Sequence, residues 1–136
     1  MAITPIKTGI RPPRIHADMQ ALHCIRATFG IGGLMPKPTV AIPIGTVPAG
    51  AFIRGAAYGV RTIFAPATTV SLGSSDGTLT NLISAGVTSA LGYFPSADGS
   101  GGLGYFPDER VIYLSLSAIP TAGVGDVIVL FYPYKD

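Results

Sequence analysis

The stretch VPAGAFIRGAAYGVRTIFAPATTVSLG, residues 47–73, decides the fold. It begins with a Pro-Ala-Gly turn, continues as a long strand-like run to Ala65-Pro66, and ends in a short run rich in Thr and Val. A similar pattern returns at the C-terminus, where TAGVGD (residues 121–126) leads into VIVLFY (residues 127–132). Such runs between Gly and Pro turns are typical of β-strands, and together the two segments predict a β-sandwich.

Other segments have the alternation or the turn boundaries of strands. Residues 110–118 alternate between two faces, whereas Pro43 would confine residues 39–46 to a sheet edge or a bulge. About seven or eight short strands with Gly and Pro between them predict an all-β fold, a jelly-roll-like two-sheet β-sandwich over residues 21–136. The clearest expected strands are residues 21–29, 39–46, 52–64, 68–72, 110–118 and 127–132.

One helical pattern interrupts these strands. Leu79, Leu82 and Ile83 have the i, i+3, i+4 spacing of an amphipathic helix. We therefore predict one short helix, which would end before Gly86.

Residues 1–20 form a separate segment with three prolines and no usable period. Proline removes backbone donors, so this segment is predicted to be an extended N-terminal arm outside the sandwich; a disordered terminus is the alternative. Fully extended, it would reach about 66 Å, far beyond the radius of a compact chain of this length. We expect it to contact a neighbouring molecule through Ile3, Pro5, Ile6, Arg11, Arg14 and His16.

The pentapeptide LGYFP occurs twice, at residues 91–95 and 103–107, with SADGSGG between the copies. Two copies are too few for a solenoid, so we predict a loop or hairpin whose two aromatic arms face each other. The aromatic residues either cap the end of the core or form a contact patch on a partner, since rigid aromatics dominate binding hot spots. They are Tyr93, Phe94, Tyr105 and Phe106.

The composition limits the classes of partner. Only 12% of the 136 residues are charged and 48% are hydrophobic, and a surface so poor in charge usually meets another protein. The net charge of +2 comes without a Lys/Arg cluster, so no nucleic-acid partner is expected. No apolar run approaches the ~18 residues of a membrane span and no signal sequence is evident, so we expect no membrane partner and synthesis in the cytoplasm. The single cysteine, Cys24, excludes an intramolecular disulfide and indicates a reducing compartment.

The titratable residues do not have the spacing of a catalytic or metal site. Nearly all the carboxylates lie beside Gly, Pro or a terminus, which are turn positions. His23 and Cys24 are adjacent, so on a strand they would point to opposite faces and could not share one metal ion. The run FGIGG at residues 29–33 lacks the helix and the Lys-Ser/Thr of a phosphate loop. The sequence therefore predicts no catalytic, cofactor-binding or metal-binding residue, and a protein that is not an enzyme.

The order of these patterns resembles that of small capsid cement, or decoration, proteins of tailed bacteriophages, of the jelly-roll type described for a Bordetella phage. The resemblance covers residues 21–136 and depends on the VPAG turn, the strand ending in Thr62-Ile63-Phe64, the TTVSLG run, and TAG before the last strand. It implies a β-sandwich that binds the outer surface of a phage head, next to the major capsid protein, and stabilises contacts between capsomers after expansion. It also implies a homodimer or homotrimer at symmetry axes of the virion, made in the host bacterial cytoplasm. The LGYFP repeat departs from the pattern of that family.

Two other functions fit the residues less well. A phage tail or fibre component, or a carbohydrate-binding jelly-roll module, could use the aromatic residues of the repeat as a platform, although the chain has no Trp. A cupin-like enzyme would need a His/Glu metal set that the chain does not contain.

Overall fold

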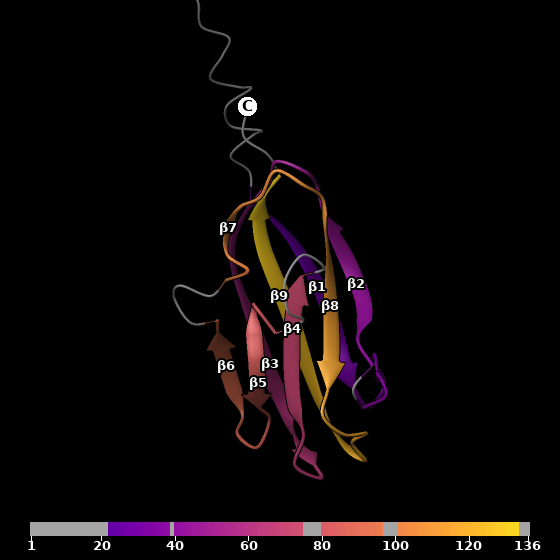
Figure 1. Ribbon diagram of the computed structural model, residues 1–136. Helices are drawn as coiled ribbons and strands as arrows, with labels where there is room; N and C mark the ends of the chain where they lie inside the picture. Colours follow the sequence, from indigo (N-terminus) through magenta and orange to yellow (C-terminus); the bar gives the residue numbers. More distant parts are fainter. Residues whose placement is uncertain (1–21, 39, 75–79, 97–100, 134–136) are drawn as a thin grey trace, which may run out of the picture.

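Two antiparallel β-sheets lie face to face in the computed structural model, which describes residues 22–38, 40–74, 80–96 and 101–133 (Figure 1). The five-stranded sheet has the order β1-β9-β3-β6, and β7 also pairs with β3. Its strands are β1 (His23–Gly30), β3 (Phe52–Ala65), β6 (Gly92–Pro95), β7 (Gly104–Tyr105) and β9 (Ala122–Tyr132). The four-stranded sheet has the order β2-β8-β4-β5. Its strands are β2 (Ile42–Val47), β4 (Thr69–Ser74), β5 (Ile83–Val87) and β8 (Arg110–Leu116).

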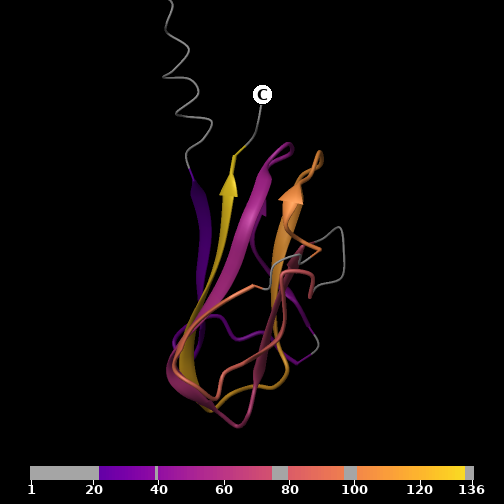
Figure 2. The same ribbon diagram turned by 90° about the vertical axis from the view of Figure 1, so that its left-hand side faces the viewer.

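The strand pairs are nested in the manner of a jelly roll. The first strand pairs with the last, β2 with β8, β3 with β6 and β7, and β4 with β5 at the centre of the chain. The chain therefore crosses repeatedly between the two layers, as the views from the front and the side show (Figures 1 and 2). This arrangement confirms the predicted all-β two-sheet sandwich, whereas the predicted arm at residues 1–20 lies outside the described residues.

The core lies between the sheets and follows from strict alternation along the strands. In β9, Val127, Val129 and Phe131 are buried while the residues between them face outward, as the period of a strand requires. Each fully buried aliphatic or aromatic side chain contributes about 1.5–3 kcal/mol to the free energy of folding. The largest fully buried side chains are Phe29, Ile53, Leu72, Leu82, Ile112, Leu114 and Leu116.

The strand with a proline behaves as predicted. β2 lies at the edge of the four-stranded sheet, and its register against β8 shifts between Pro43 and Gly45. Because Pro43 cannot donate a backbone hydrogen bond, it is tolerated where one side of the strand has no neighbour.

The predicted short helix is wrong. Residues 83–87 form strand β5, in which Ile83 pairs with Leu72, and the amide of Leu82 donates a hydrogen bond to the carbonyl oxygen of Leu72. Edge pairing with β4 buries Leu82 and Ile83 in the core, which outweighs the helical spacing of three residues. Leu79, the first residue of the helical pattern, lies outside the described residues.

Candidate interaction surface

The outer face of the five-stranded sheet is hollow along its centre because of the small residues of β3. On this face Gly55, Ala57 and Gly59 lie opposite Leu130, Ile128 and Asp126 of β9, respectively. Small residues leave the strand backbone uncovered between the side chains of the neighbouring strands β9 and β6. The sequence thus produces a trough whose floor is β3.

Two adjacent hollows of about 340 Å³ and 280 Å³ occupy this trough, and Tyr93 of β6 lines both. The first is bordered by Arg26, Arg61, Asp126 and Ile128, and the second by Arg54 and Leu130. We call this surface the arginine face. It comprises Arg26, Arg54, Arg61, Tyr93, Asp126, Ile128 and Leu130.

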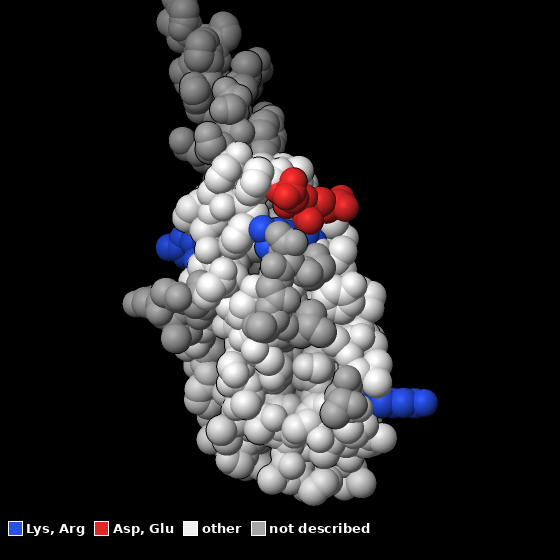
Figure 3. Space-filling model, in the orientation of Figure 1, with Lys and Arg blue, Asp and Glu red and all other residues white. Residues whose placement is uncertain are grey.

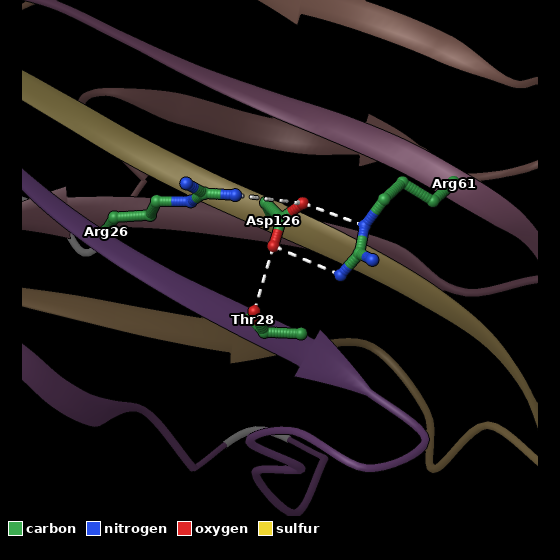
Figure 4. Close-up of polar contacts among 4 residues, drawn as sticks. All are labelled: Arg26, Thr28, Arg61 and Asp126. Carbon is green, nitrogen blue, oxygen red and sulfur yellow. Dashed lines mark hydrogen bonds and ion pairs between the residues drawn. The ribbon is translucent and has the colours of Figure 1, made fainter.

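Asp126 is the centre of a polar network on the arginine face (Figure 4). Its Oδ1 accepts hydrogen bonds from Thr28 Oγ1 at 2.9 Å and from Arg61 Nη2 at 3.3 Å, and its Oδ2 lies 2.9 Å from Arg61 Nε. Arg26 Nη2 is 4.0 Å from Oδ2. The Asp126 side chain is only 19% exposed, whereas those of Arg26 and Arg61 are 68% and 58% exposed.

This network leaves the arginine face positive. Arg26, Arg54 and Arg61 carry three positive charges, and Asp126 supplies one negative charge, which Arg61 holds in a two-point contact. The outward guanidinium groups can therefore pair with carboxylates of another molecule, while the hollow beside Tyr93 can receive an apolar side chain.

The aromatic arms of the two LGYFP copies do not face each other across the predicted loop or hairpin. Strands β6 and β7 lie one after the other along the same edge of β3, where Tyr93 pairs with Gly59 and Tyr105 with Phe52. The aromatic arms therefore do not face each other. The backbone of the 14-residue strand β3 offers both copies unpaired groups, and pairing with this long strand replaces pairing between the copies.

Within each copy, the two aromatic residues point in opposite directions. Tyr93 and Tyr105 are 63% and 47% exposed, whereas Phe94 and Phe106 pack against the core. The ring of Phe94 lies 5.1 Å from that of Tyr58, and the guanidinium carbon of Arg110 lies 4.0 Å from the centroid of Phe106. The tyrosines have the geometry of a contact patch and the phenylalanines that of a core cap. The role of these four residues at an interface stays a prediction.

An acidic site that the sequence analysis did not single out lies at one end of the molecule. Asp108 and Glu109 are exposed in the loop between β7 and β8, and the acidic atoms visible in Figure 3 gather at that end. Sequence reasoning treated them as turn residues. Their adjacency, in a chain with so few charges, is the signal that could have identified them.

The remaining predicted contact residues cannot be placed. Ile3, Pro5, Ile6, Arg11, Arg14 and His16 lie outside the described residues. Their roles stay predictions.

The neighbouring residues His23 and Cys24 point to opposite faces of β1. The register places His23 opposite Phe131, with ring centroids 5.8 Å apart, and Cys24 opposite Leu130. Within the part of the chain that the structure describes, no three His, Cys, Asp or Glu side chains lie close enough to hold a metal ion. In the same residues no helix has the length and apolarity to cross a membrane.

Comparisons with known proteins identify the fold. No protein-family model matches the chain, and no curated protein sequence matches it. Solved structures do match, at low sequence identity. A chain of the acid-stable capsid of Helicobacter pylori bacteriophage KHP30 is 16% identical with a TM-score of 0.58, and the match covers 82% of this chain and 88% of that one.

Two further phage structures are similar. A chain of the cyanophage Pam1 capsid asymmetric unit is 14% identical with a TM-score of 0.52, over 82% of this chain and 84% of that one. A chain of the capsid of Ralstonia phage GP4 is 16% identical with a TM-score of 0.51, over 85% and 86% of the two chains. At these identities the similarity shows that the fold of this chain also occurs among the chains of phage capsids.

Proposed function

We propose that this chain is a structural virion protein, a capsid cement protein that binds the outer surface of a tailed-phage head and stabilises contacts between capsomers. The observation that carries the proposal is the shared fold: chains of three phage capsids match more than four fifths of this chain. A shared fold alone does not determine function, so the surface must supply the rest of the argument.

The surface has the properties of an assembly protein. Large apolar side chains are exposed at Phe52, Leu91, Tyr93 and Tyr105, and exposed apolar patches mark surfaces that bind other proteins. Tyr93 and Tyr105 belong to strands at a sheet edge, where rigid aromatic rings can enter pockets of a partner. The partners we propose are the major capsid protein and further copies of this chain, as a homodimer or homotrimer.

Quantitative mass spectrometry of purified virions tests the proposal. A cement protein covers the shell, so its copy number should approach that of the major capsid protein. Virions that lack the chain, or that contain only a few copies, would overturn the proposal.

The second candidate is a tail, fibre or carbohydrate-binding module, and the exposure of Tyr93 and Tyr105 favours it because sugar sites use exposed aromatic rings. Antibody labelling of intact particles separates the candidates. A cement protein would be labelled over the whole head, whereas a fibre protein would be labelled at the tail or at the vertices.

A further inference from the structure

The charges of the described residues are concentrated at two separate places on the molecule. The acidic residues are Asp108, Glu109 and Asp126, of which Asp126 is held by Arg61 on the arginine face. Of the five basic residues, Arg26, Arg54 and Arg61 lie on that face. The other two are Lys37 and Arg110. The arginine face thus has a net charge of +2, and the loop of Asp108 and Glu109 is negative even with the neighbouring Arg110 counted.

The acidic loop is anchored at its base and projects its carboxylates. The amide of Phe106 donates to the carbonyl oxygen of Ala51, and the carbonyl oxygen of Phe106 accepts from the amide of Gly50 at 3.0 Å. The guanidinium of Arg110 packs over the Phe106 ring. These contacts fix the start of the loop, while Asp108 and Glu109 are exposed and, among the described residues, lie in no ion pair. A fixed loop loses little conformational entropy when it docks.

The arginine face is complementary to this loop in charge and has hollows beside its guanidinium groups. Its hollows beside Tyr93 are open to solvent, and guanidinium groups lie at both ends: Arg26 and Arg61 at one hollow, Arg54 at the other. Two adjacent carboxylates can reach such groups with charge-assisted hydrogen bonds. Exposed Pro107 lies directly before the carboxylates and can enter the apolar part of the trough.

Charge disfavours contacts between two identical surfaces. Two arginine faces placed against each other would bring three guanidinium groups of one copy onto three of the other, and two acidic loops would repel in the same way. The N-terminal arm contains Lys7, Arg11 and Arg14 against a single acid, Asp18, so it also repels the arginine face. The complementary contact joins different surfaces of two copies. Such a contact can be made twice across a two-fold axis, or it can repeat from copy to copy in a ring or a filament.

We propose that copies of this chain assemble head to side, with the Asp108–Glu109 loop of one copy docked on the arginine face of the next. This inference rests on the self-association included in the proposed function, and it names the two surfaces that meet. It predicts an assembly held by charge, which weakens as the salt concentration rises.

Charge reversal tests the contact, because reversing both surfaces in one chain makes their charges opposite again. Sedimentation analysis would compare the wild-type protein with a face variant (Arg26→Glu, Arg54→Glu), a loop variant (Asp108→Arg, Glu109→Arg) and a variant that carries all four changes. Each reversal alone should raise the dissociation constant at least about tenfold, and the fourfold variant should return to within about threefold of the wild-type value. Lys37→Glu, an exposed change in the loop between β1 and β2, should leave the constant unchanged.

Thermal melts of every variant establish that the chain is folded. The inference would be overturned if the variant with all four changes is folded but does not recover association. It would also be overturned if reversing one surface has no effect, or if the wild-type protein is monomeric up to about 1 mM. The proposed function is tested separately. Virions rich in the chain together with unaffected reversal variants would overturn only the head-to-side contact. Charge-dependent self-association together with virions that lack the chain would overturn only the cement function.

Discussion

Tyr93 and Phe94, neighbours in β6, should contribute different amounts to the free energy of unfolding. Phe94 packs against the core beside Tyr58, whereas Tyr93 points outward. Phe94→Ala should therefore cost about 2 kcal/mol of unfolding free energy, below the usual value for a fully buried Phe because part of its ring is exposed. Tyr93→Ala should stay within about 0.5 kcal/mol of the wild type. Denaturant unfolding of the two variants measures both values, and equal losses would contradict the opposite orientations of the two rings.

Tyr58 makes stability depend on pH at the alkaline end. Burial raises the pKa of its phenol above the ordinary value of 10.0, and the hydroxyl donates a hydrogen bond to the carbonyl oxygen of Val87 at 3.0 Å. The folded state therefore holds this proton more tightly than the unfolded state does. The stabilisation that the protonated Tyr58 phenol gives the folded state is fully present below pH 10.0. It is lost as pH rises through the higher pKa of the folded state.

Tyr58→Phe tests this dependence. At neutral pH the variant should lose about 1 kcal/mol of unfolding free energy, because the hydrogen bond is removed. Above pH 10.0 its stability should fall less steeply than that of the wild type. Tyr93→Phe, at an exposed position, is the matched control and should keep the wild-type slope. Parallel slopes for Tyr58→Phe and the wild type in denaturant titrations would show that the Tyr58 proton is not coupled to folding.

At the scale of the strands, a glycine at the start of β9 allows this strand to pack closely against β3. Gly123 has φ +123°, and a Cβ added there would lie 2.7 Å from the Cα of Phe64 in β3. Gly123→Ala should therefore cost more than backbone strain alone, about 3 kcal/mol or more, because backbone atoms cannot move aside cheaply.

Gly104 in β7 is the matched control for Gly123. Its φ is +112°, but nothing lies within 4 Å of an added Cβ, so Gly104→Ala should cost only the strain of about 1–2 kcal/mol. Thermal melts compare the two variants. A loss at Gly104 as large as that at Gly123 would assign the whole effect to φ and none to crowding.

The strand predictions succeed because strands are indicated by local patterns in the sequence, whereas the pairing of distant strands is not. Alternation in β8 and the proline of β2 are local signals, so the sequence predicts both the strands and the edge position of β2. The partner of the LGYFP copies is β3, in which Gly59 pairs with Tyr93 and Phe52 with Tyr105, far apart along the chain. The helix predicted at Leu82 and Ile83 gives way to pairing with β4. Local spacing contains no information on such long-range pairs. The arginine face is hidden for the same reason, since Arg26, Arg61 and Asp126 come from three strands.

At the scale of the whole molecule, the sandwich and the N-terminal arm should have separable roles. Among the described residues, the buried core begins at Phe29, and residues 1–19 lie outside the strand pattern of the sequence. We therefore expect a chain that lacks residues 1–19 to melt within a few degrees of the full-length protein. If the arm contacts a neighbour on the head, the truncated chain should bind heads more weakly.

Two full-length variants separate the kinds of contact that the arm could make. Ile3→Ser with Ile6→Ser removes apolar contacts, and Arg11→Ala with Arg14→Ala removes charge. Binding to heads that lack the protein, measured at low and high salt, distinguishes them because only the charge-dependent part is screened. Loss of binding in the isoleucine variant at both salt concentrations would indicate an apolar anchor, and a loss in the arginine variant that disappears at high salt would indicate an electrostatic one. Global unfolding of the truncated chain would instead make the arm part of the folded domain and contradict the separation of roles.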